Sequence, residues 1–150
     1  MRSNAFSSDM GAEESNQPVL KETALAYAAP PRFPALHDSR YPVSRMAEVL
    51  EPYLRAIIEK IHPEKIILFG SYAYGQPTEH SDFDLLVVRR GIQFSKESNL
   101  EIRRAIRDVE APPAAFTFLS RTPEGLEQKL REGSPVYEEI VNKGILLYAA

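Results

Sequence analysis

Asp82 and Asp84 are the residues whose type and spacing bear most directly on chemistry. They begin the stretch 82–90, whose continuous apolar centre predicts a strand that is buried on both faces. Because side chains alternate between the two faces of a strand, both carboxylates are expected on one face, with their α-carbons about 7 Å apart. Two carboxylates at that spacing repel each other, and a hard divalent cation with oxygen ligands relieves the repulsion.

Gly70 and Ser71 follow another apolar run, residues 65–69, and form the second half of the candidate site. Glycine lets a phosphate approach the backbone closely, and a helical turn after it would present free N–H groups. The serine hydroxyl adds a donor for a phosphate oxygen. The spacing of Gly70 and Gly75 matches that of P-loop glycines, but Gln76-Pro77 replaces the required Lys-Ser/Thr pair. A Walker A motif is therefore excluded.

The elements that must position these residues follow from the hydrophobic pattern. Strands are predicted over 65–69, 82–90, 114–120 and 145–148. Helices are predicted over about 44–61 and 95–109, from Pro123 to Gly133, and from Pro135 to Gly144. In the first helix, Pro52 predicts a kink or a new helix start. This order predicts an α+β domain with a small mixed β-sheet of about four strands flanked by helices. The short connection between the first two strands favours an antiparallel or mixed pair over a right-handed βαβ unit.

Composition limits the function classes and the domain organisation. Residues 1–43 contain five of the chain's twelve prolines and are expected to form a disordered or extended arm, while residues 44–150 form the domain. The net charge of −3 disfavours duplex nucleic acid as a partner. The chain has no cysteine, which excludes thiol catalysis and disfavours zinc. The apolar runs fall short of the ~20 residues that cross a bilayer, so no membrane partner is expected and a cytoplasmic protein is predicted.

The segment GSYAYGQPTEHSDFD, residues 70–84, resembles the signature of the DNA polymerase β-like nucleotidyltransferase superfamily. That signature is Gly-Ser, ten residues, then Asp-x-Asp, and Gly75 and Ser81 match positions often seen in minimal members of the superfamily. The resemblance extends from the helix before Lys65 to the C-terminal NKGILLY. It implies the polymerase β-like nucleotidyltransferase fold for residues 44–150.

The resemblance also implies an activity and a set of roles. The reaction would be metal-dependent transfer of a nucleoside monophosphate, AMP from ATP, to a hydroxyl of a protein or another acceptor. Gly70 and Ser71 would bind the nucleoside triphosphate, and Asp82 and Asp84 would be catalytic and bind Mg²⁺ or Mn²⁺. Minimal members are often cytoplasmic. Many pair with a HEPN-domain protein as the antitoxin of a toxin–antitoxin module, and some transfer AMP to a tyrosine of that partner.

One feature departs from the pattern of active members, which carry a third carboxylate on the next core strand. Here that strand, 114–120, holds no acid, and Thr117 is the polar residue in its middle. A threonine does not act as a general base near neutral pH, so transfer would be slow, lost, or dependent on an acid from elsewhere, such as Asp108 or Glu110. Two hypotheses stay open: an enzyme, or a catalytically weak or inactive module of the same fold that binds a nucleotide or a partner. Nucleotidylation of a small molecule has less support.

Overall fold

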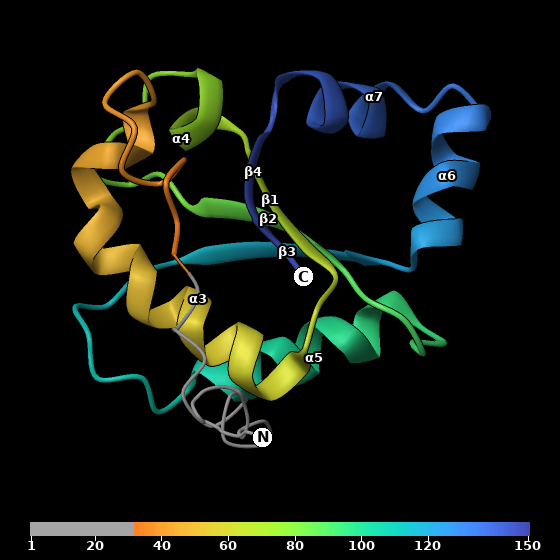
Figure 1. The fold of residues 1–150 in the computed structure, drawn as a ribbon, viewed down its shortest axis with the longest axis horizontal. Coiled ribbons are helices and arrows are strands. Elements are labelled where there is room, and N and C mark those ends of the chain that lie inside the picture. The colour runs from red at the N-terminus through yellow and green to blue at the C-terminus, as the bar shows by residue number, and fades with distance from the viewer. Residues whose placement is uncertain (1–31) are drawn as a thin grey trace, which may run out of the picture. The chain divides into compact units, whose positions relative to one another are not determined.

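The computed structural model describes residues 32–150, of which Phe33–Ala150 form one compact unit. Its centre is a four-stranded sheet made of β1 (Lys65–Phe69), β2 (Phe83–Val88), β3 (Phe116–Arg121) and β4 (Ile145–Ala149), in the order β3-β2-β1-β4 (Figure 1). β1 is antiparallel to β2 and to β4, whereas β2 and β3 are parallel. The predicted mixed sheet is confirmed, and so is the antiparallel pairing of the first two strands.

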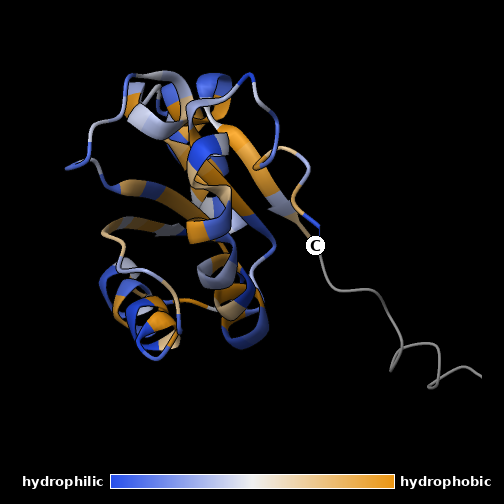
Figure 2. Ribbon diagram, turned by 90° about the vertical axis from the view of Figure 1, so that its left-hand side faces the viewer, coloured by the Kyte–Doolittle hydropathy of each residue, from blue (hydrophilic) through white to orange (hydrophobic). Residues whose placement is uncertain are grey.

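Helices cover both faces of this sheet. α3 (Ala47–Ile61) and α5 (Ser95–Ile106) lie on one face, and α6 (Pro123–Arg131) and α7 (Pro135–Lys143) lie on the other (Figure 1). Along β2, Leu85 and Val87 join the larger core beneath α3 and α5, while Leu86 and Val88 join the core beneath α6 and α7. Figure 2 shows hydrophobic residues running along the strands between these layers. β2 is therefore buried on both faces, as its apolar centre predicts.

Local signals account for several helix boundaries. The Thr122 hydroxyl caps α6 by accepting a hydrogen bond from the Gly125 N–H at 2.9 Å, and proline occupies the first helical turn of both α6 and α7. Pro52 lies inside α3, where it does not start a new helix. A 3₁₀-helix, η2 (Pro42–Met46), leads into α3.

The packed unit begins before residue 44. Phe33, Leu36 and Val43 are buried in the main core, with 2%, 0% and 0% of their surfaces exposed. The Arg55 guanidinium of α3 lies over the Phe33 ring at 5.1 Å. The predicted boundary at residue 44 is therefore corrected to Phe33, because a few apolar side chains suffice to hold residues 33–43 against α3. The arm predicted for residues 1–31 lies outside the described residues.

Candidate active site

Asp82 and Asp84 lie at the N-terminal end of β2, on the face covered by α6 and α7. Asp82 directly precedes the strand, and Asp84 shares its face with Leu86 and Val88. Phe83, between the two aspartates, points to the opposite face and is buried in the main core. Both carboxylate residues are half-buried. The alternation predicted from the sequence is thus present, and it places two acids at the end of an otherwise apolar strand face.

Gly70 brings the end of β1 into contact with Asp84. A Cβ atom added to Gly70 would lie 2.0 Å from Asp84 Oδ2, so a larger residue here would displace this carboxylate. The backbone of Gly70 also has φ +78°, a conformation that side chains disfavour. In the antiparallel pairing, Phe69 is the partner of Asp84, which explains why the next residue of the chain passes the carboxylate so closely.

Ser71 begins α4 (Ser71–Tyr74), a single helical turn after Gly70. The N–H groups of Ala73 and Tyr74 both donate to the Gly70 carbonyl, at 3.0 and 3.1 Å. Within the described residues, the N–H of Ser71 makes no such backbone bond, so it is available to a ligand. The turn is anchored by Tyr72, whose ring stacks on Phe83 at a centroid distance of 4.5 Å. The structure therefore holds the Gly-Ser turn against the strand that carries the aspartates.

Gly75 and Ser81 shape the loop between α4 and β2. A Cβ atom at Gly75 would lie 2.9 Å from the Ser71 α-carbon, so a side chain there would push against the α4 turn. The Ser81 hydroxyl accepts a hydrogen bond from the Thr78 N–H at 2.8 Å, and the Ser81 N–H donates to the Thr78 carbonyl at 3.0 Å. These contacts define the approach of the chain to Asp82.

Thr117 occupies the place next to the two aspartates on β3. Its α-carbon is the register partner of Asp84, and its hydroxyl donates to Asp82 Oδ2 at 3.2 Å. β3 contains no acid, as the sequence indicates. Asp108 and Glu110, the alternative sources of a third carboxylate, are exposed and follow α5 on the chain. In the part of the chain that the structure describes, no group of three His, Cys, Asp or Glu side chains gathers to hold a metal.

The electrostatics of the pair favour a bound cation. Burial raises the pKa of Asp84 and the neighbouring Asp82 charge raises it further, while the Thr117 hydroxyl lowers it. No Lys, Arg or His among residues 32–150 forms an ion pair with either aspartate. Two carboxylates and a hydroxyl on one face are hard oxygen donors, which fit Mg²⁺ or Mn²⁺. This donor set would leave several coordination positions of one such ion to ligands from outside the chain.

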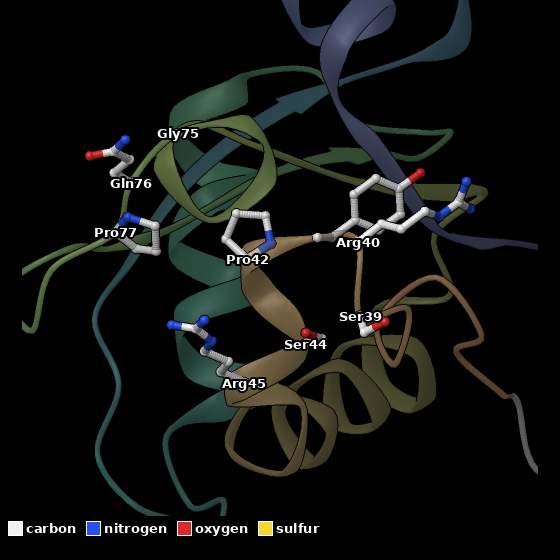
Figure 3. A pocket seen from close by; sticks show the side chains of 9 residues that line it. Ser39, Arg40, Pro42, Ser44, Arg45, Gly75, Gln76 and Pro77 are labelled. Carbon is white, nitrogen blue, oxygen red and sulfur yellow. The ribbon is translucent and has the colours of Figure 1, made fainter.

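Two cavities lie near the α4 turn. One, of about 300 Å³, is bounded by Gly70, Tyr74 and Asp84 on one side and by Pro135, Val136 and Glu139 of α7 on the other. The second, of about 380 Å³, is lined by residues 39–42, 44–45 and 75–77 (Figure 3). Neither Asp82 nor Asp84 lines it. The first cavity therefore belongs to the candidate site. Its α7 wall was missed by the sequence analysis, because no local pattern connects α7 with residues 70–84.

An α+β domain with two aspartates on a central strand, packed against a Gly-Ser turn, defines the class of polymerase β-like nucleotidyltransferase domains. The family described as "Polymerase beta, Nucleotidyltransferase" matches residues 53–150 of this chain, and the chain belongs to that family. The fold and family that the resemblance implies are thus confirmed. The matched residues include the Gly-Ser turn, both aspartates, β3 and α7.

Two known proteins give more specific comparisons. A protein from Methanocaldococcus jannaschii named "Putative protein adenylyltransferase" is 40% identical over 45 residues, which are 30% of this chain and 45% of that protein. The matched segment thus spans less than half of that relative. A crystal structure of a "putative nucleotidyltransferase" from Sulfolobus solfataricus is similar with a TM-score of 0.39 and 17% identity, covering 68% of this chain and 87% of the other. No helix within residues 32–150 is both long and apolar enough to cross a membrane.

Proposed function

We propose that this chain is a Mg²⁺-dependent nucleotidyltransferase that moves AMP from ATP to a hydroxyl group of a protein. The observation that supports this most strongly is the contact between the Asp84 carboxylate and Gly70, where a side chain would displace the carboxylate. That contact supports a single site made of the Gly-Ser turn and the carboxylate pair. Gly70 and Ser71 then bind the terminal phosphates, and Asp82 and Asp84 hold the ion.

In this reaction, an acceptor oxygen forms a bond to the α-phosphorus of ATP while the bond to pyrophosphate breaks. Asp82 and Asp84 would hold Mg²⁺, which would supply positive charge to neutralise the negative charge that develops on the phosphates. The α4 turn binds the far end of the triphosphate. The acceptor hydroxyl must also lose a proton, and Thr117 is too weak a base to take it near neutral pH. We therefore expect slow transfer by the isolated chain, and faster transfer where an acceptor protein brings its own base.

A protein acceptor is supported by the similarity to the M. jannaschii relative, which is named as a putative protein adenylyltransferase. We propose a HEPN-domain protein as the partner, with this chain as the antitoxin of a cytoplasmic toxin–antitoxin pair. The support for that partner is the resemblance of residues 70–84 to minimal members of the superfamily.

A second candidate function is binding without transfer. The observation that favours it is Thr117, whose hydroxyl stands beside Asp82 where active members carry an acid. In that case the chain binds Mg²⁺–ATP, or a partner alone, and neutralises the partner by contact.

Calorimetric titration of ATP, with and without Mg²⁺, tests both candidates. We expect wild-type protein to bind ATP only with Mg²⁺, and Asp82→Asn/Asp84→Asn to lose that binding. Glu97→Gln is the control, because it neutralises an exposed acid of α5, on the face of the sheet opposite the aspartates, and should bind like wild type. Labelled α-phosphate retained on an acceptor protein then identifies the enzyme, whereas binding without labelling favours the second candidate. Absence of Mg²⁺-dependent binding in wild type would overturn the proposal.

A further inference from the structure

The cavity between α4 and α7 has two chemically different walls. Gly70 and Asp84, which belong to the proposed phosphate and metal site, line one wall. Glu139, Pro135 and Val136 of α7 line the other. The volume of about 300 Å³ leaves room for a group of nucleoside size next to Asp84.

Tyr74 holds the Glu139 carboxylate in place. The Tyr74 hydroxyl donates to Glu139 Oε2 at 2.7 Å, across 65 residues of sequence. Burial raises the pKa of Tyr74, and the hydrogen bond to Glu139 raises it further, so the phenol keeps its proton and remains the donor. The bond engages only one oxygen of Glu139. Among the hydrogen bonds of residues 32–150, none reaches the other oxygen, so it can accept one from a ligand.

The charge of Glu139 selects which part of a nucleotide can lie against the α7 wall of the cavity. An ionised carboxylate is an acceptor without donors, and it repels phosphate. It is complementary to neutral groups that donate hydrogen bonds, and the hydroxyls of a ribose are such groups. The neighbouring surface is mixed. Val136, 56% exposed beside the cavity, suits the face of a sugar or base, while Lys143 Nζ lies 5.9 Å from the centroid of the Tyr74 ring.

We propose that this cavity binds the nucleoside part of the substrate, with Glu139 accepting a hydrogen bond from a ribose hydroxyl and Tyr74 positioning Glu139. The inference rests on the proposed function, since it assumes that the triphosphate binds at the Gly70-Ser71 turn. It adds a selectivity: the chain binds ribonucleotides in preference to nucleotides without ribose hydroxyls, and Glu139 orients the nucleotide by rejecting its phosphates.

The test compares Mg²⁺-dependent binding of ATP, 2′,3′-dideoxy-ATP and inorganic tripolyphosphate by calorimetry. For wild type we expect ATP to bind about tenfold more tightly than the dideoxy analogue, which corresponds to one good hydrogen bond. Glu139→Ala should reduce this ratio to near one without weakening tripolyphosphate. Tyr74→Phe keeps the ring but frees Glu139, so it should reduce the ratio by a smaller factor.

Glu138→Ala is the matched control, because it removes the same charge from the neighbouring, exposed position of α7. It should leave the ratio unchanged. If Glu139→Ala weakens the binding of ATP and of the dideoxy analogue equally, the proposed nucleoside site is wrong while the phosphate site stands. The same conclusion follows if ATP binds to wild type no more tightly than tripolyphosphate. If neither ATP nor tripolyphosphate binds to wild type with Mg²⁺, the proposed function fails together with this inference.

Discussion

At the scale of single residues, Asp84 lies where its carboxylate adds little to the stability of the metal-free fold. Its carboxylate is half-buried, lies against Gly70 and shares a strand face with Asp82. Burial and the second carboxylate both disfavour the charged form, which is why the pKa of Asp84 is raised. A group in this position is better explained by binding than by stability, since a cation removes the repulsion that the fold alone leaves uncompensated.

Asp84→Asn should therefore stabilise the metal-free protein at neutral pH. Because the folded-state pKa of Asp84 is raised, folding binds a proton more tightly, and the unfolding free energy falls as the pH rises through that pKa. The asparagine variant escapes this loss, so its unfolding midpoint in a chelator should exceed that of wild type at pH 7. The difference should shrink below the ordinary aspartate pKa of 3.8.

Thermal unfolding followed by circular dichroism measures this, with Asp108→Asn as the exposed-acid control. A lower midpoint for Asp84→Asn than for wild type at neutral pH would show that Asp84 stabilises the fold through contacts other than those described. Added Mg²⁺ should raise the midpoint of wild type and leave that of Asp84→Asn nearly unchanged.

At the scale of elements, the parallel pairing of β2 with β3 decides what stands beside the aspartates. This register makes Thr117 the partner of Asp84, and the same alternation sends Phe116 and Phe118 into the main core. Only residue 117 and the positions two residues away on β3 share the face of the carboxylates. β3 therefore supplies no third carboxylate. In residues 32–150, no loop brings a third acid to the two aspartates instead.

Thr117→Asp should restore a third carboxylate on that face. We expect tighter Mg²⁺ binding and a rise in AMP transfer of about 10²-fold, the low end of what a general base contributes. Without metal, a third negative charge should also lower the unfolding midpoint. Thr117→Asn has nearly the same shape without the charge and serves as the control. If Thr117→Asp alters neither metal affinity nor transfer, residue 117 does not occupy the third position.

At the scale of the whole molecule, the candidate site depends on packing on both faces of one sheet. The core beneath α3 and α5 holds Phe83 and Tyr72, which anchor β2 and the α4 turn. The smaller core beneath α6 and α7 holds Tyr137 and Ile140, which place Glu139 at the cavity. Residues 33–43 add to the first of these cores, so they are part of the domain that supports the site.

Leu36→Ala tests the contribution of that segment. Leu36 is fully buried, and removing a buried leucine side chain typically costs about 2–5 kcal/mol of unfolding free energy. Leu100→Ala makes the same change at a side chain that is 47% exposed, and it should cost much less. Urea unfolding of both variants measures the difference. Equal, small effects would mean that residues 33–43 are dispensable for the stability of the domain.

The sequence by itself determined the features that depend on residues close together in the chain. Alternation along a strand places Asp82 and Asp84 on one face, and the apolar centre of β2 predicts its burial. The turn after β1 needs Gly70, and Thr122 marks the start of α6. These are local consequences of backbone geometry and side-chain type, so they can be read from a short window.

Only the tertiary structure decided which distant segments meet at the site. The pairing of β3 with β2 brings Thr117 to Asp82, the packing of α7 brings Glu139 to Tyr74, and residues 33–43 join the main core. None of these contacts has a local signal, because they follow from how helices and strands share buried surface across the whole domain. The cavity between α4 and α7 exists only through those long-range contacts.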